Sequence, residues 1–360
     1  MKITVSKKAI ASALQHCVSA APRQSTMPIL RCCLIQPGEG GFRLRAGSEG
    51  LKMAVTCLVE GKVKDPEPLC VPAHELFDRV RALPDGDIQL ETAKGKLTLK
   101  SGARKLSVST LAPEDFPKIP DPDGQPITLP VKTLATAIKA TVYAVSDEPS
   151  RPSLYGLKVS LAAGVLTMAS CDSYRLAEWS GRTESDGELV ALVPKPSALL
   201  LRSVLESAEG DAQILTNDPT LFVTVGSVTF AAVTIDPSVF PPIDRVIPTN
   251  KRNEVELMPA VAVESFRALS VASGKKGDIR IAATGGKMRA FVESEDSGES
   301  SDEFQAIGAS FDAVKSNVSY LIDALVSLGT ETATVDCGAF NEPILIKGGS
   351  VRAVVMPVMT

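Results

Sequence analysis

The sequence predicts an α+β protein built from three similar domains, each with two helices packed on antiparallel strands. Three stretches carry this prediction, because each combines apolar residues at helical spacing with a strand directly afterwards. The stretches are VPAHELFDRVRALPDGDIQ at 71–89, VPKPSALLLRSVLESAEGDAQ at 193–213 and NVSYLIDALVSLGTETAT at 317–334. They recur at intervals of about 120 residues, which indicates repeated domains and not one large core.

A second similarity supports the repeat away from the helices. AGSEGLKMA at 46–54 aligns with ASCDSYRLA at 169–177, so that Glu49 meets Asp172 and a base follows three residues later in both. An acid beside a base at a repeated position is typical of a structural turn or ion pair. The repeats place the domains at residues 1–126, 127–248 and 249–360.

The remaining elements follow from alternating or helical patterns. In the first domain we expect helices at 6–18 and from Val71, and strands at 2–5, 29–36, 41–46, 52–59, 87–92, 96–101 and 105–110. In the second we expect helices at 131–143 and from Val193, and strands at 127–129, 155–160, 165–169, 175–180, 213–216, 221–225 and 229–235. In the third we expect helices at 262–270 and from Asn317, and strands at 278–283, 288–293, 333–337, 343–346 and 351–355.

Two segments fall outside this pattern. APEDFPKIPDPDGQP at 112–126 carries five prolines and predicts a linker without regular structure. ESEDSGESSDE at 293–303 is acidic and rich in serine, which predicts an exposed loop.

Composition excludes several classes of protein. The seven cysteines are odd in number and form no C-x-x-C motif, so we expect buried, reduced thiols. No apolar leader or run of membrane-spanning length occurs, which predicts a soluble, cytoplasmic protein without a membrane partner. The only histidines, His16 and His74, fall within helices, and no phosphate-binding glycine loop follows a strand. We therefore expect no metal, no cofactor and no catalytic residue.

Charge is unevenly placed, although the whole chain carries only −4. The predicted helices contain ten bases, counting Lys315, and five acids, so the rest of the chain is acidic. Two interpretations are open: ordinary solvated helix faces, or helices that face a polyanion through weak contacts independent of sequence.

Several short segments, in this order and spacing, resemble the bacterial DNA polymerase III β subunit, the sliding clamp family. They are MPIL at 27–30, LPDG at 83–86, SVSTLAPEDFP at 107–117, CDSYRLA at 171–177, FPPIDRVIP at 240–248, NVSYLIDAL at 317–325 and VVMP at 354–357. The resemblance covers the whole chain. It implies a non-catalytic processivity factor, which encircles duplex DNA as a head-to-tail homodimer and forms half of a six-domain ring, with helices inside and sheets outside.

The resemblance also implies a pocket that takes short linear peptides from the DNA polymerase III α subunit, the clamp loader and repair proteins. Its expected lining is Leu154, Cys171, Ser173, Tyr174, Arg175, Leu176, Pro241, Arg245, Val246, Asn341, Pro343, Val354, Met356, Pro357 and Val358. Without the resemblance, Val354 and Met356 would be interpreted as core residues. Tyr174 stands where some relatives have His, and the tail Val358-Met359-Thr360 lacks a basic residue often found there.

DNA contacts and a subunit interface follow from the same resemblance. Carried-over DNA contacts are Arg23, Gln24, Arg81 and Lys195, to which we add the nearby bases Arg151, Arg202, Lys251 and Arg252. The expected dimer contact joins Leu106 and Val108 of one chain to Val271 and Ala272 of the other. Pro152 and Ser153 replace two aromatic residues of some relatives, which argues against stacking on unpaired bases there.

Two alternatives remain open at this point. One is an accessory clamp of a plasmid, phage or specialised locus, which the unusual pocket residues would fit. The other belongs to a different class: a β-rich scaffold that binds peptides, does not bind DNA and need not close a ring.

Overall fold

The structure is a computed structural model, and it describes residues 1–249, 253–274, 277–294 and 298–359. The predicted DNA contacts Lys251 and Arg252, and Thr360 of the tail, lie outside the described residues. Contacts divide the chain into two compact units. Unit 1 comprises Met1–Ala135 and Pro196–Ile235, and unit 2 comprises Thr136–Lys195 and Asp236–Thr360.

The described residues contain six α-helices, and polar caps fix several of their ends. They are α1 Lys7–Ala20, α2 Ala73–Ala82, α3 Val131–Thr141, α4 Lys195–Glu206, α5 Pro259–Ser270 and α6 Val318–Leu328. The Ser6 hydroxyl accepts a hydrogen bond from the Ala9 amide at the start of α1. The Asn317 side chain caps α6 in the same way, and Gly329, with φ of 62°, ends that helix in the left-handed region.

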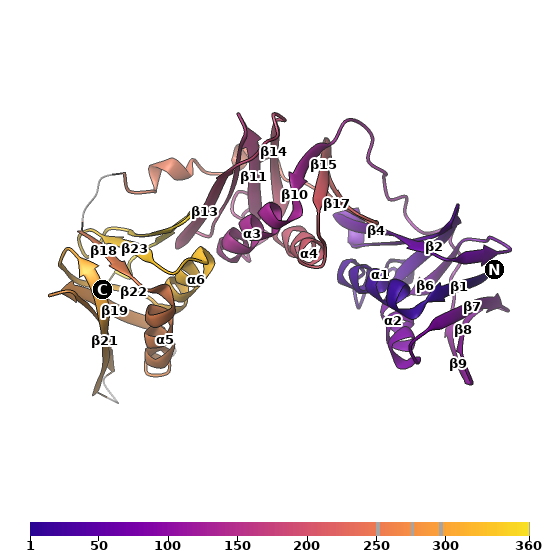
Figure 1. Cartoon of the computed structure of the whole chain (residues 1–360), viewed down its shortest axis with the longest axis horizontal. Coiled ribbons are helices and arrows are strands. Elements are labelled where there is room, and N and C mark those ends of the chain that lie inside the picture. Colours follow the sequence, from indigo (N-terminus) through magenta and orange to yellow (C-terminus); the bar gives the residue numbers. More distant parts are fainter. Residues whose placement is uncertain (250–252, 275–276, 295–297, 360) are drawn as a thin grey trace. The chain divides into compact units, whose positions relative to one another are not determined.

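Unit 1 holds two antiparallel sheets. The five-stranded sheet has the order β5 Lys62–Lys64, β1 Lys2–Ser6, β7 Asp87–Ala93, β8 Lys96–Ser101 and β9 Arg104–Ser109. The eight-stranded sheet has the order β10 Ile127–Pro130, β15 Asp211–Asn217, β16 Thr220–Val225, β17 Val228–Val233, β4 Met53–Glu60, β3 Gly41–Gly47, β2 Cys32–Gly38 and β6 Leu69–Pro72. Helices α1 and α2 lie side by side, and each contacts strands of both sheets (Figure 1). Their apolar faces, including Ile10, Leu14 and Leu76, are fully buried.

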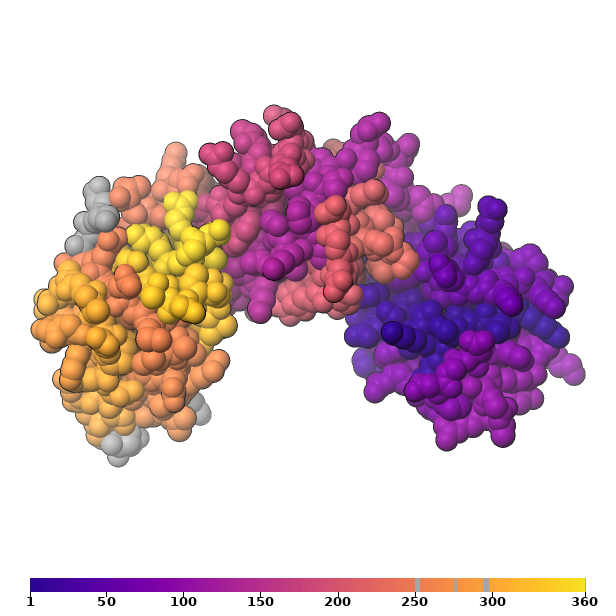
Figure 2. All heavy atoms as spheres, viewed as in Figure 1, coloured from indigo at the N-terminus to yellow at the C-terminus, as the bar shows by residue number. Residues whose placement is uncertain are grey.

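Unit 2 holds one antiparallel sheet of twelve strands. Its order is β14 Leu189–Pro194, β11 Gly156–Ala162, β12 Val165–Cys171, β13 Arg175–Arg182, β25 Val351–Val355, β24 Ile344–Gly348, β23 Ala333–Cys337, β18 Asn253–Leu257, β21 Gly298–Gly308, β20 Lys287–Ser294, β19 Asp278–Thr284 and β22 Phe311–Asn317. Helices α5 and α6 pack on each other and on strands of this sheet. Figure 2 shows the C-terminal residues of this unit, in yellow, next to the magenta residues of its earlier segment.

Two strand pairs explain why the compact units differ from the predicted domains. β4 pairs with β17, and β13 pairs with β25, so each large sheet joins strands from two predicted domains. The division into three domains at 126 and 248 therefore stays a prediction.

Proline accounts for two errors in the predicted helix starts. Val71 and Val193 lie at the ends of β6 and β14, where they pair with Cys33 and Leu157. Pro72 and Pro194 follow directly, and because proline has no amide hydrogen the ladder ends there and a helix begins. A proline also explains a third error: Ile29–Arg31, predicted as strand, form a 3-10 helix that begins at Pro28.

The described part of the acidic run at 293–303 lies in strands, which corrects the prediction of a loop there; residues 295–297 lie outside the described residues. From Gly298 the run forms β21, which pairs with β20. Glu299 and Glu303 form ion pairs with Arg289 and Lys287 on that neighbouring strand. Opposite charges on neighbouring strands stabilise a sheet. The sequence of this run contains only its own acids, so it does not reveal the basic partners on the neighbouring strand.

The proline-rich segment 112–126 has no helix or strand, as predicted, but it is packed against unit 1. Phe116 and Ile119 are buried in a cluster with Leu30 and Phe222. The Arg45 guanidinium forms an ion pair with Asp121 and donates to the Ile119 carbonyl. The segment therefore contributes to the core of the unit.

The described residues contain no helix with the length and apolar character that a membrane crossing needs. All seven cysteines are free and buried, as predicted. Burial raises the pKa of the Cys32 thiol to about 11, so this thiol stays protonated near neutral pH.

Candidate functional site

An apolar cavity of about 220 Å³ lies in unit 2, between strands β12, β13 and β25 and the 3-10 helix Ile243–Arg245. Its lining is Leu154, Cys171, Ser173, Arg175, Leu176, Pro241, Ile243, Val246, Val354 and Met356. Nine of these residues were predicted for the pocket. Ile243 was missed, although it is the last residue of the Phe-Pro-x-Ile pattern shared with the first domain.

The register of three strands explains the apolar floor of this cavity. Cys171 on β12 pairs with Leu176 on β13, which pairs in turn with Val354 on β25. Paired residues of antiparallel strands point to the same face, so these three side chains form one row. All three are buried. The Met356 amide extends the pairing by donating to the Tyr174 carbonyl at 2.8 Å.

A tight turn joins β12 to β13 and forms the edge of the cavity. Ser173 has a φ of 80°, which is unusual for a residue with a side chain. The Asp172 carboxylate stabilises this turn by accepting hydrogen bonds from the Tyr174 and Arg175 amides, each at 3.0 Å. The acid at this repeated position is therefore structural, as the sequence indicated.

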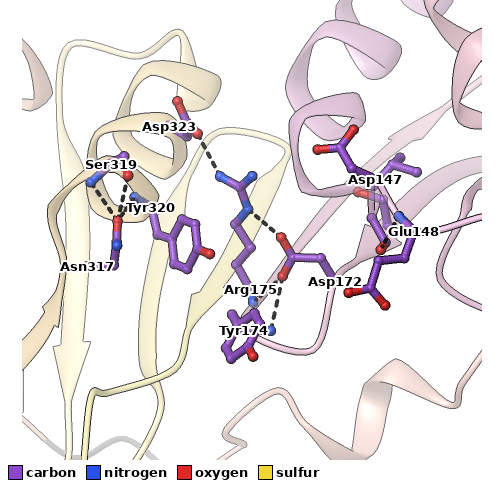
Figure 3. A network of polar contacts seen from close by, with 12 residues as sticks. Asp147, Glu148, Asp172, Tyr174, Arg175, Asn317, Ser319, Tyr320 and Asp323 are labelled. Atoms are coloured by element: carbon purple, nitrogen blue, oxygen red, sulfur yellow. Dashed lines mark hydrogen bonds and ion pairs between the residues drawn. The ribbon is translucent and has the colours of Figure 1, made fainter. Parts of the chain in front are cut away.

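Arg175 is fixed by four contacts, and Figure 3 marks the two that join it to Asp172 and Asp323. Its Nε lies 2.9 Å from the second oxygen of Asp172, and its Nη1 lies 2.6 Å from Asp323 Oδ2 on α6. The guanidinium carbon lies 5.4 Å from the ring centroid of Tyr143 and 4.5 Å from that of Tyr320. Only 15% of the side chain is exposed. Arg175 therefore joins β13 to α6 and has limited freedom to bind a peptide.

Two tyrosines form an aromatic surface beside the same cavity. Tyr174 is 61% exposed and stacks on Tyr320, with ring centroids 6.4 Å apart and planes 27° apart. Tyr320 was not predicted as a site residue. Tyr320 lies in the NVSYLIDAL segment that resembles the family, but nothing in the sequence indicates that it contacts Tyr174.

The structure leaves six predicted pocket residues out of the cavity lining. They are Tyr174, Arg245, Asn341, Pro343, Pro357 and Val358. Asn341 and Pro343 lie in a loop whose neighbours Phe340 and Glu342 line a different cavity, of about 750 Å³. Val358 is held elsewhere, since its amide donates to the Lys315 carbonyl at 2.8 Å.

The predicted DNA contacts fall into two groups by their electrostatic environment. Arg23, Gln24 and Arg81 are exposed, and Arg81 stacks on Phe77 at 5.5 Å. In contrast, three bases already have acidic partners: Lys195 with Asp147 at 2.7 Å, Arg151 with Glu148 at 2.9 Å, and Arg202 with Glu206 at 3.5 Å.

The helices keep their basic excess, with one correction. Lys315 lies in β22 and not in a helix, and it pairs with Asp278 at 3.0 Å. The six α-helices of the described chain therefore carry nine bases and five acids.

The predicted dimer residues differ in exposure. Leu106 is half-buried on β9, which is an edge strand of the five-stranded sheet. Val271 directly follows α5 and is 86% exposed, with Ala272 half-buried beside it. Val108 is only 2% exposed, because it points into the core of unit 1. Val108 is thus a core residue of unit 1, and its contact with a partner chain stays a prediction.

Comparison with known proteins decides the family. The profile of the DNA polymerase III beta subunit matches twice: its N-terminal domain at residues 1–120 and its central domain at 128–241. The chain belongs to this family. A beta sliding clamp from Pseudomonas aeruginosa is 27% identical over 353 residues, which cover 96% of this chain and 95% of that protein.

Solved structures agree with this assignment. The DNA polymerase III subunit beta from Pseudomonas aeruginosa superimposes with a TM-score of 0.91, at 25% identity and with full coverage of both chains. A sliding clamp from the same organism, bound to griselimycin, gives a TM-score of 0.92 at 25% identity, again over both whole chains. Membership in this family gives the chain DNA sliding clamp function in replication, as a non-catalytic processivity factor.

Proposed function

We propose that the chain works as a head-to-tail homodimer that encircles duplex DNA and tethers DNA polymerase III and other partners through short peptides. The observation that carries this proposal is the apolar cavity of unit 2, built from the row Cys171, Leu176 and Val354. Its apolar floor, polar rim and small size suit one large aliphatic or aromatic side chain of a partner peptide. The proposed pocket keeps all fifteen predicted residues as candidates, with the ten lining residues at its centre.

Two open strand edges support a head-to-tail dimer. β9 is an edge strand and exposes Arg104 and Lys105. Residues 298–305 of β21 pair with β20 and with no other strand of the described chain, and they expose Glu299, Asp302 and Glu303. A basic edge and an acidic edge are complementary, and pairing them between two chains would remove both exposed edges.

The same dimer would bring Leu106 of one chain toward Val271 and Ala272 of the other. Exposure of Val271 at 86% is unusual for an apolar residue and is consistent with burial in an interface. Three domains in each chain would then complete a ring of six, with the domain divisions at 126 and 248.

Weak DNA contact fits the charge of the helices. An excess of four bases, spread over six helices, is too diffuse for strong local binding. We expect Arg23, Gln24, Arg81, Arg151, Lys195, Arg202, Lys251 and Arg252 to contact phosphates without reading the sequence of the bases. Retention on DNA would come from the closed ring and not from affinity.

Loading onto circular and linear DNA tests this function. The chain, loaded onto a nicked circle by a clamp loader, should resist a salt wash and dissociate once the circle is cut. Salt weakens the contacts between basic side chains and phosphates, but it does not open a closed ring around circular DNA. Equal retention on circular and linear DNA would show binding by affinity and would refute the ring.

A further inference from the structure

The loop at residues 146–155 carries two acids beside two of the proposed DNA contacts. Its ends are tied together, because the Ser146 amide donates to the Leu154 carbonyl at 3.0 Å. The Leu154 and Tyr155 amides both donate to the Arg151 carbonyl, also at 3.0 Å. Asp147 and Glu148 project from this closed loop, with 91% and 58% of their side chains exposed.

Lys195 is held against this loop from the first turn of α4. Its backbone amide donates to the Tyr155 carbonyl at 3.0 Å. Its ammonium group donates to the Val145 carbonyl at 2.7 Å and lies 2.7 Å from Asp147 Oδ1. Only 17% of the Lys195 side chain is exposed. The charge is therefore fixed in place and is partly neutralised by Asp147.

Arg151, which lies within the loop, forms a second ion pair of this kind. Its Nε lies 2.9 Å from Glu148 Oε2, and 55% of its side chain is exposed. Figure 3 shows Asp147 and Glu148, which are adjacent in the sequence, close together. Two neighbouring acids thus pair with two bases that would otherwise face an anionic ligand.

We propose that Asp147 and Glu148 compete with DNA phosphates for Lys195 and Arg151, and so limit the strength of DNA contact. This inference rests on the proposed DNA-encircling function. Carboxylate and phosphate oxygens accept the same charged hydrogen bonds from Lys and Arg. A phosphate can take either base only after an existing ion pair breaks, so each contact yields less free energy than a contact with an unpaired base.

The exposed Arg81 provides a comparison within the same chain. It forms no ion pair with any described acid, and its guanidinium lies over the Phe77 ring. A phosphate can reach it without displacing a carboxylate. We therefore expect Arg81 to contribute more to DNA affinity than Lys195 does, although Lys195 is held by more contacts.

The test removes both carboxylates and measures equilibrium binding. The full-length variant Asp147→Asn/Glu148→Gln keeps the size of both side chains and leaves the backbone bonds of the loop in place. Its binding to a fluorescently labelled short duplex, measured by anisotropy at low salt, should tighten by about 2- to 10-fold, as expected from the strength of two surface ion pairs. The gain should shrink as salt rises, because screening weakens both competitors.

A charge-matched control separates this local effect from the change in net charge. Glu184→Gln/Asp186→Asn also removes two exposed acids, which form no ion pair with a described residue. This control should change affinity by much less. Asp147→Glu, which keeps the charge, should stay close to the original protein. Equal gains in the two double variants, or no gain in the loop variant, would overturn the proposal.

A double-mutant cycle gives a second measurement. Lys195→Gln should weaken binding little in the original protein and more in the Asp147→Asn background, where the ammonium group is free. Equal losses in both backgrounds would also refute competition. Salt-resistant retention on a nicked circle tests the ring separately, so failure of this inference and failure of the proposed function give different results.

Discussion

Arg175 on β13 and Asp323 on α6 form an ion pair at 2.6 Å, although 148 positions separate them in the sequence. Asp172 holds the other edge of the same guanidinium, and the ring of Tyr320 covers it at 4.5 Å. This contact connects one wall of the apolar cavity, on β13, to α6 in the third predicted domain. Because both edges of the guanidinium are held in this way, we expect Arg175 to position the cavity wall and not to bind a peptide directly.

The first prediction distinguishes these two roles. Asp323→Asn should lower peptide affinity if Arg175 positions the wall, because the wall loses its link to α6. It should raise peptide affinity if Arg175 binds the peptide directly, because the guanidinium is then released. We expect a loss, measured by isothermal titration with a polymerase C-terminal peptide, and a fall of about 0.5–1 kcal/mol in the free energy of unfolding.

Arg175→Ala should have a larger effect on stability than Asp323→Asn. It leaves Asp172, of which only 14% is exposed, without its charged partner, at a cost of about 1–3 kcal/mol. Thermal melts of the two variants provide the comparison. Tighter peptide binding by Asp323→Asn would contradict the positioning role.

The second prediction concerns the dimer. Leu106→Asp should give monomers, because the proposed interface would bury an unpaired carboxylate. Sedimentation at micromolar concentration should show about twice 37.9 kDa for the original protein and about 37.9 kDa for the variant. Val108 is unsuitable for this test, since a charge there would disrupt the core of unit 1.

Leu58→Asp is the matched control for Leu106→Asp. Leu58 is 50% exposed on β4, which belongs to the eight-stranded sheet of the same unit, whereas β9 belongs to the five-stranded sheet. Its substitution should leave the dimer intact. A stable monomer of the original protein at micromolar concentration would rule out the ring.

The third prediction concerns the C-terminal segment. Deletion of residues 356–360 removes Met356 from the cavity and two backbone hydrogen bonds, to Tyr174 and Lys315. We expect peptide affinity to fall by more than about 10-fold, while the free energy of unfolding falls by only about 1–3 kcal/mol. Titration calorimetry and thermal melts measure the two effects.

A shorter deletion provides the control. Removal of Met359 and Thr360 alone keeps Met356 in place, and Met359 is 65% exposed. This variant should bind the peptide as the full chain does. If deletion of 356–360 left affinity unchanged, the proposed pocket would be misplaced.

The fourth prediction concerns a carboxylate on β7. Hydrogen bonds and charge from Lys100, and then from Lys2, lower the pKa of Glu91 to about 2. Because the folded pKa lies below the ordinary value, this group stabilises the fold above about pH 4.5 and loses that contribution as pH falls toward 2. Carbon NMR should find Glu91 still ionised at about pH 3.5.

Substitution of the two lysines tests the cause of this shift. Lys100→Met should raise the pKa of Glu91 more than Lys2→Met, because Lys100 makes the shorter contact, at 2.6 Å against 3.1 Å. Equal shifts, or an ordinary pKa in the original protein, would contradict the geometry.

Local patterns were sufficient for much of the fold. The spacing of Leu76 and Val80 predicted α2, and both residues are fully buried on its inner face. Alternation of apolar and polar residues predicted the positions of most strands. In a strand with one buried face, every second side chain points into the core and is apolar. The family resemblance, carried over residue by residue, also predicted nine of the ten residues that line the cavity.

Other features depend on partners that are distant in the sequence. From Gly298 the acidic run forms a strand that pairs with β20, where Lys287 and Arg289 form ion pairs with its acids Glu303 and Glu299. Val71 and Val193 belong to strands because Cys33 and Leu157 pair with them. A local pattern contains no information about these partners, so the sequence by itself could not place them.

By itself, then, the sequence determined the α+β class, the repeated helices, the family and most of the cavity lining, since these depend on local periodicity and short motifs. Only the tertiary structure decided that Arg175 is held by Asp323, that Lys195 is paired with Asp147, and that Val108 is buried. The physical reason is that ion pairing and burial depend on distance in space. The free energy of a charged side chain is set by neighbours that the fold brings within about 4 Å of it.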